Sequence, residues 1–126
     1  MSMPKNILII DDEKLVVESL SKLLKKEGYR VILAGNYKEA LARLKETDFD
    51  LIVSDIKMPE IDGVEIIRKI RRFLRENGKK SIPEILITGY SGEDCLKRAE
   101  ELKVADLIYK PFDVRDFLKI VKNNLK

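Results

Sequence analysis

The sequence predicts one doubly wound α/β domain, a (βα)5 three-layer sandwich with a parallel sheet of strand order 2-1-3-4-5. Three observations predict it. Five apolar runs of strand length alternate with segments of helical period, the connections are short, and several runs are nearly continuous Ile, Leu and Val. Continuous apolar strands are typical of parallel sheets buried on both faces, and the alternation is typical of βαβ crossovers.

The expected strands are short apolar runs, most of which stop at polar or turn-forming residues. In chain order they are Asn6–Ile10, Arg30–Ala34, Leu51–Asp55, Glu84–Thr88 and Asp106–Tyr109. Each has four or five residues, which is ordinary for a strand in a globular sheet.

The segment after each strand carries an apolar stripe at helical spacing. The stripes are Val16, Leu20, Leu23 and Leu24; Ala40, Leu41 and Leu44; Val64, Ile67, Ile70 and Leu74; Cys95, Leu96, Ala99 and Leu102; and Val114, Phe117, Leu118, Val121 and Leu125. Gly28 after Lys25 and Lys26 predicts the first helix end, Asn77-Gly78 predicts the third, and Asp113 is the expected N-cap of the fifth.

The composition limits the classes of function that the chain can have. The chain has 126 residues, 44% hydrophobic and 37% charged, and we expect residues 1–126 to form a single domain without an output domain. No run of about 18 apolar residues occurs, so no membrane span is expected. A net charge of +3 is too small to indicate direct nucleic-acid binding. Cys95 is the single cysteine, which excludes an internal disulfide and favours a cytoplasmic protein.

The composition also limits which metal ions the chain can bind. With no histidine and one cysteine, a structural zinc site is excluded. Any metal should therefore be a hard ion bound by oxygen, and Mg²⁺ is the default.

One basic run stands out: Arg68, Lys69, Arg71, Arg72, Arg75, Lys79 and Lys80. The simpler interpretation is the solvated face of one helix. The alternative is a docking surface for an acidic partner.

Chemically suggestive residues stand at the ends of four expected strands. Asp11-Asp12 and Asp55 end the first and third strands, Thr88 ends the fourth, and Lys110 follows the fifth. In an open parallel sheet these ends share one edge, where ligands bind at the reversal of strand order. Three carboxylates brought together repel one another and must bind protons or a cation.

These motifs together resemble those of response-regulator receiver domains of two-component signalling. The resemblance rests on Ile9–Glu13, Ser54–Pro59 with Asp62-Gly63, Thr88-Gly89 and Tyr109–Phe112, and it covers nearly the whole chain. It implies the flavodoxin-like form of the fold. It also implies a cis peptide bond between Lys110 and Pro111.

The resemblance implies the role of each site residue. Asp55 is the expected phosphoacceptor, with Lys110 gripping one phosphoryl oxygen and Thr88 hydrogen-bonding another. Mg²⁺ is expected on Asp12, Asp55 and the backbone carbonyl of Lys57, with Asp11 acting through water. Gly89 is expected to keep the approach to the phosphoryl group open.

The resemblance also implies partners and activity. The donor is expected to be a sensor histidine kinase or a histidine phosphotransfer protein. The chain is expected to catalyse only its own phosphotransfer and autodephosphorylation, so it is a signalling protein and not an enzyme. A homodimer through the fourth helix, fifth strand and fifth helix is compatible with the resemblance, and so is a monomer.

Four positions are unusual or tunable. Leu107 replaces the aromatic residue that often acts as a rotamer switch three residues before the lysine, and Tyr90 or Tyr109 could take part instead or simply pack. Lys57 and Tyr90 lie two residues after Asp55 and Thr88, where the family tunes the phosphoryl lifetime. For Glu13 the simpler interpretation is an acidic residue in the first turn of a helix. The alternative is a contribution to the electrostatic potential of the site.

Four rival interpretations differ from this one in the residues that they need. A flavodoxin-like cofactor binder would bring a phosphate against the repelling Asp11–Glu13 run, and a P-loop enzyme needs a Gly-x-x-x-x-Gly-Lys run that is absent. A phosphatase of the haloacid dehalogenase type needs an acid where Lys57 stands. The remaining alternative is a receiver-like interaction module that acts without phosphorylation.

Overall fold

The computed structural model describes residues 3–58, 60–89 and 93–126, so the predictions for Pro59 and Tyr90 lie outside the described residues. Strands and helices alternate along this part of the chain as predicted. They are β1 (Asn6–Ile10), α1 (Lys14–Lys26), β2 (Arg30–Ala34), α2 (Tyr37–Glu46), β3 (Leu51–Asp55), α3 (Gly63–Glu76), β4 (Glu84–Thr88), α4 (Glu93–Leu102), β5 (Asp106–Tyr109) and α5 (Val114–Asn124). All five predicted strands are confirmed at their predicted residues.

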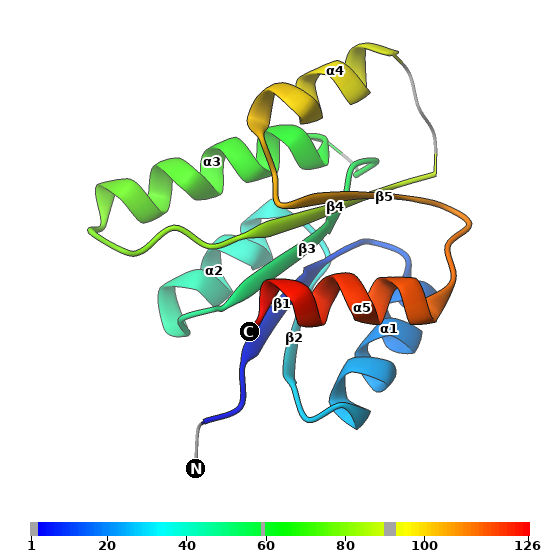
Figure 1. Ribbon diagram of the computed structural model, residues 1–126. Helices are drawn as coiled ribbons and strands as arrows, with labels where there is room; N and C mark the ends of the chain where they lie inside the picture. The colour runs from blue at the N-terminus through cyan, green and yellow to red at the C-terminus, as the bar shows by residue number, and fades with distance from the viewer. Residues whose placement is uncertain (1–2, 59, 90–92) are drawn as a thin grey trace.

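The strands form one parallel sheet in the order β2-β1-β3-β4-β5 (Figure 1). The predicted strand order is therefore confirmed. The chain runs outward from β1 to β2 and returns to β3 on the other side of β1, so the strand order reverses between β1 and β3. Asp11 follows the carboxyl end of β1 and Asp55 ends β3, which places both residues at the reversal.

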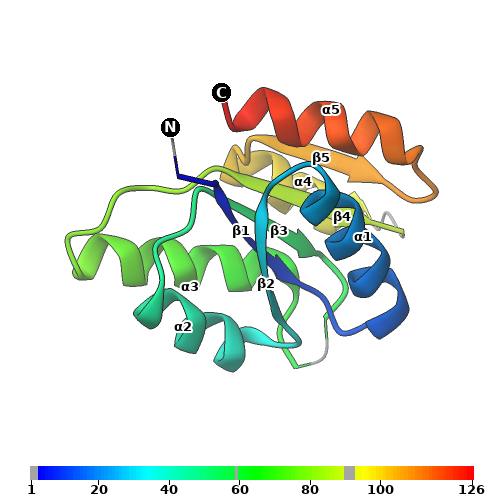
Figure 2. The same ribbon diagram turned by 90° about the horizontal axis from the view of Figure 1, so that it is seen from below.

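Helices cover both faces of the sheet, as Figure 2 shows. Because side chains alternate along a strand, Ile7 and Ile9 face one layer and Leu8 and Ile10 face the other. The first pair packs with residues of α1 and α5, and the second pair packs with residues of α2, α3 and α4. Strands β3 and β4 are buried along their whole length, which explains their continuous apolar sequences.

The predicted helix ends are also confirmed. Helix α1 ends at Lys26 and Gly28 follows with φ of 92°, while α3 ends at Glu76 and Gly78 follows with φ of 63°. Positive φ values favour glycine, which explains both stops. Asp113 caps α5 by accepting a hydrogen bond from the backbone N–H of Arg115 at 2.7 Å. None of the described helices has the length and apolar character needed to cross a bilayer.

The basic run needs one correction. Arg68, Arg72 and Arg75 are exposed on α3, as expected of a solvated face. Arg71 is not: its guanidinium donates to both carboxylate oxygens of Glu84, at 2.8 and 2.7 Å, and to the carbonyl of Leu102 at 2.7 Å. Glu84 is buried, so the bidentate pair supplies the partner that a buried carboxylate needs.

Candidate functional site

Asp55 is a buried carboxylate at the carboxyl end of β3, and its side chain is only 3% exposed. The backbone N–H of Lys57 donates to Oδ1 at 3.1 Å, and the Lys110 ammonium donates to Oδ2 at 2.9 Å. Both oxygens are therefore held by donors. A buried carboxylate with this support is held in one orientation.

Lys110 reaches Asp55 from the loop after β5. Its backbone N–H donates to the carbonyl of Thr88 at 2.7 Å, and its stem passes over Gly89, where an added Cβ would stand 3.3 Å from the lysine Cδ. The glycine thus makes room for the lysine stem, a reason that sequence analysis did not give. The Lys110–Pro111 peptide bond is cis, as the resemblance implies.

The charge of Lys110 is stabilised by its neighbours. Burial alone lowers the pKa of the ammonium, but the hydrogen bond to Asp55 and the negative charges of Asp55, Asp11 and Glu13 outweigh burial, so the pKa lies above its ordinary value. Lys110 therefore stays cationic at neutral pH and is the charge partner of the carboxylates.

Asp11 is buried beside β3, and its Oδ1 accepts the backbone N–H of Glu13 at 2.9 Å. Burial raises the pKa of Asp11 to about 6, and the negative charges of Asp55 and Glu13 add to the rise. The bond from Glu13 and the charge of Lys110 oppose it. Burial is thus the larger cause of the raised pKa, and the repulsion that the sequence predicts for carboxylates brought together adds to it.

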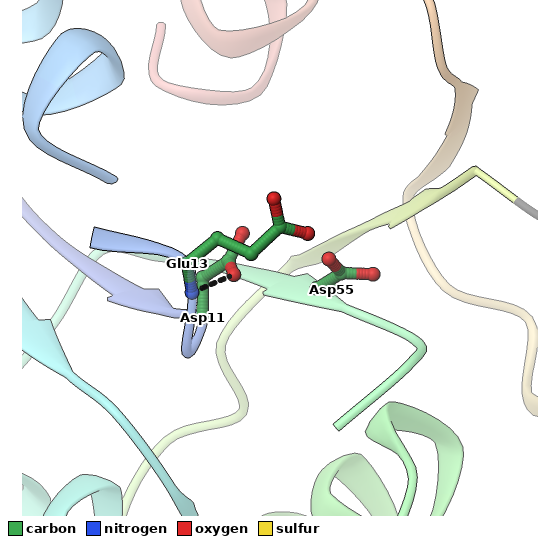
Figure 3. A group of neighbouring side chains, drawn as sticks. All are labelled: Asp11, Glu13 and Asp55. Atoms are coloured by element: carbon green, nitrogen blue, oxygen red, sulfur yellow. Dashed lines mark hydrogen bonds between the residues drawn. The ribbon is translucent and has the colours of Figure 1, made fainter. Parts of the chain in front are cut away.

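Glu13 is the site residue for which the sequence left two accounts open. It is the N-cap residue of α1, but its side chain makes no capping bond. Instead its carboxylate lies 3.6 Å from the Lys110 ammonium and, with Asp11 and Asp55, offers oxygens that all lie within 4.8 Å of one another (Figure 3). The structure thus favours a contribution to the potential of the site over the first-turn account.

The other predicted residues lie outside this group of three carboxylates. Thr88 is buried at the end of β4, and Asp12 is exposed beside Asp11. The Lys57 side chain is exposed, while its backbone N–H contacts Asp55. Leu107 is half-buried and packs toward the helix layer that contains α4. The predicted roles of these residues as ligands or switches stay predictions.

The donor set fits a hard divalent cation. Three carboxylates meet at one place among the described residues, with one ammonium facing two of them. Carboxylate oxygens are the ligands that Mg²⁺ prefers, and a cation would relieve the repulsion among these carboxylates, which adds to the effect of burial on the pKa of Asp11.

Comparison with known proteins agrees with this geometry. The family model described as response regulator receiver domain matches residues 7–122. A transcriptional regulatory protein, ZraR of Klebsiella oxytoca, is 38% identical over 108 residues, which are 86% of this chain and 23% of that protein. The chain thus spans about a quarter of the length of this curated relative.

Solved structures agree as well. A CheY-like receiver domain protein of Methanospirillum hungatei is 30% identical with a TM-score of 0.87, covering 98% of this chain and 94% of the other. The signal receiver domain of a signal transduction histidine kinase from Syntrophus aciditrophicus is 34% identical with a TM-score of 0.83, covering 96% and 89%.

Proposed function

The chain belongs to the response regulator receiver domain family, and on that premise we propose that Asp55 accepts a phosphoryl group from a phosphohistidine of a partner protein. The observation that carries the proposal is the buried Asp55 carboxylate, held at both oxygens by Lys110 and the Lys57 N–H beside two further carboxylates. The donor is a sensor histidine kinase or a histidine phosphotransfer protein, and the setting is the cytoplasm.

The proposed reaction is a transfer between two proteins. A carboxylate oxygen of Asp55 bonds to phosphorus while the bond from phosphorus to the donor imidazole nitrogen breaks. The bonding electrons return to that nitrogen, which takes up a proton. Phosphoryl transfer proceeds through a loose transition state with charge spread over the equatorial oxygens, so positioning and electrostatics supply most of the catalysis.

Charge is the first obstacle, because the nucleophile and the phosphoryl group are both negative. Mg²⁺ held by Asp12, Asp55 and the Lys57 carbonyl, with Asp11 acting through water, would neutralise that charge when bound. Glu13 supports this assignment, because it brings a further carboxylate to Asp11 and Asp55.

Residues of this chain take the remaining roles. Lys110 already contacts Asp55, so its ammonium has only a short way to move to a phosphoryl oxygen on that side chain. Thr88 ends the neighbouring strand, which supports its role as hydrogen-bond donor to a second phosphoryl oxygen. Gly89 leaves the space that the Lys110 stem occupies.

A direct test uses small phosphodonors. We expect incubation with Mg²⁺ and acetyl phosphate to give a phosphoryl adduct, located at Asp55 by mass spectrometry after peptide digestion. Asp55→Asn should abolish the adduct. Asp48→Asn, which changes a fully accessible carboxylate at the opposite edge of the sheet, should not. No adduct in the wild type, under conditions in which another receiver reacts, would favour the alternative function as an interaction module that acts without phosphorylation.

We further propose that Lys57 and Tyr90 tune autodephosphorylation. Replacing either residue by alanine should change the lifetime of the phosphoryl group on Asp55 and leave the thermal unfolding temperature close to that of the wild type. Equal decay rates in the wild type and both variants would contradict this role.

Output from the phosphorylated chain is a separate question. A homodimer through α4, β5 and α5 and a monomer that binds a target are both compatible with the exposed Tyr109 and Val114 on that side. Light scattering on the chain with Mg²⁺ and beryllofluoride, at several protein concentrations, distinguishes them.

A further inference from the structure

Helix α4 is joined to the start of α3 by one arginine. The guanidinium of Arg98 donates to both oxygens of Asp62, at 2.8 and 3.4 Å, and to Glu65 Oε1 at 3.3 Å. The Arg98 side chain is 28% exposed and that of Asp62 is 32% exposed. A planar guanidinium that bridges two carboxylates in a partly buried place fixes geometry better than an exposed single pair does.

Asp62 precedes a residue that packs on the backbone of Asp55, the proposed phosphoacceptor. It caps α3 by accepting the N–H of Glu65 at 3.0 Å, and the next residue, Gly63, donates to the carbonyl of Ile56 at 2.7 Å. A Cβ on Gly63 would stand 2.3 Å from the carbonyl oxygen of Asp55. The backbone at Gly63 therefore packs directly on the backbone of Asp55, and Asp62 is the residue bonded to Gly63 in the chain.

Helix α4 contributes Ala99 to the core, and its Leu102 packs against the same core cluster. Of its side chains that the structure describes, Ala99 alone is buried. Its C-terminal end is held by Arg71, which donates to the Leu102 carbonyl while it grips Glu84. Polar contacts to α3 thus contribute to the attachment of α4 beside these apolar contacts.

We propose that Arg98 is a positioning residue that couples α4 to the acceptor loop, which we define as residues 56–58 and 60–62. A change at Asp55 moves this loop, Asp62 moves with the loop, and Arg98 carries the displacement into α4. The coupling rests on the proposed phosphorylation of Asp55. This route to α4 does not need an aromatic side chain at position 107. The Leu107 side chain has no polar group with which to hydrogen-bond Thr88.

The test is NMR spectroscopy of the full chain with Mg²⁺ and beryllofluoride, an analogue of the phosphoryl group. In the wild type we expect amide shifts in the acceptor loop and in α4 at Leu96, Ala99 and Leu102. In Arg98→Ala the loop shifts should remain and the α4 shifts should fall by about half or more, as expected when one coupling contact is removed.

Three further variants sharpen the test. Asp62→Asn keeps the helix cap, since asparagine caps as well as aspartate, but weakens the ion pair, so it should also reduce the α4 shifts. Arg98→Lys keeps the positive charge but lacks the planar guanidinium that bonds two oxygens at once, so the α4 shifts should be partly lost. Arg72→Ala, an exposed arginine on α3, should respond like the wild type.

The outcomes separate two failures. Full α4 shifts in Arg98→Ala and Asp62→Asn, or no α4 shifts in a wild type whose loop shifts, would overturn the coupling and leave the proposed phosphorylation intact. No loop shifts in the wild type would overturn both. A well-dispersed spectrum of Arg98→Ala before the analogue is added excludes unfolding of α4 as the cause of lost shifts.

Discussion

Gly63 should be intolerant of a single methyl group. It is the first residue of α3, and in the interior of a helix alanine is more favourable than glycine by about 0.5–1 kcal/mol, so helix propensity gives no reason for alanine to destabilise. Here the added Cβ would meet the Asp55 carbonyl oxygen at 2.3 Å and the Ile56 Cα at 2.8 Å, both in the backbone. We therefore predict that Gly63→Ala destabilises the protein.

The size follows from the contact. Real Cβ atoms essentially never approach closer than 3.0 Å, so the backbone must open by about 0.7 Å. Overpacking of this kind costs about 1–3 kcal/mol, and because backbone is displaced we expect about 2–3 kcal/mol net. With an unfolding entropy of about 2.1 cal/mol/K per residue, each kcal/mol lowers the melting temperature of this chain by about 4 °C, which gives a fall of about 8–12 °C.

The assay is thermal and urea unfolding followed by circular dichroism. Gly35→Ala is the matched control, because a Cβ there would first meet Glu39 Oε2 at 3.4 Å, the flexible end of a side chain. We expect that control to stay within about 0.5 kcal/mol of the wild type. A Gly63→Ala protein as stable as the wild type, or no less stable than Gly35→Ala, would refute the reasoning.

Three other predictions concern charges. Without Mg²⁺ at pH 7, Lys110→Met should lower the free energy of unfolding by about 3 kcal/mol, because the buried Asp55 carboxylate loses its partner. In an Asp55→Asn background the same substitution should lower it much less. Equal losses in the two backgrounds, measured by urea unfolding, would contradict this prediction. Arg71→Met should lower the free energy of unfolding by about 3 kcal/mol, because it leaves the buried Glu84 carboxylate without its cationic partner. Adding Glu84→Gln should recover part of that loss in the same assay. Burial alone would raise the pKa of Asp62, but hydrogen bonds from Arg98 and the helix N–H hold it below 3.8. The stability advantage of the wild type over Asp62→Asn should therefore be complete above pH 3.8 and fade as the pH falls through the lowered value; an advantage that grew on acidification would be the contrary result.

The strands were predictable because burial on both faces leaves few sequence solutions. Each run of Ile, Leu and Val lies within the sheet, and the polar residue at or just beyond its end marks where the strand leaves the core. Helix ends were predictable where the backbone needs a particular residue, as at Gly78 with φ of 63° and at the cap Asp113. These are local constraints, so neighbouring residues suffice to recognise them.

The convergence of Asp11, Asp55 and Lys110 was predictable for a topological reason, since parallel strands bring their carboxyl ends to one edge. Contacts between helices were not. Arg98 and Asp62 are far apart in the sequence, and their meeting depends on how α4 packs on α3. No spacing within either helix encodes that distance.

Arg71 is an intermediate case, because a signal existed. It follows Ile70 and precedes Leu74, so it lies at the border of the buried stripe of α3 and not on its solvated face. Glu84 opens a strand that is buried throughout, and a buried carboxylate requires a cation. Searching for the partner of Glu84 would have separated Arg71 from the rest of the basic run.

Glu13 shows why the charges of the site must be considered together. Lys110 faces Asp55 at 2.9 Å and Glu13 at 3.6 Å, so one ammonium serves two carboxylates while Asp11 carries a raised pKa beside them. A phosphoryl group on Asp55 would add negative charge and compete with Glu13 for the same ammonium. The carboxylates of Asp11, Glu13 and Asp55 offer oxygens that could hold a divalent cation, which would offset that added negative charge.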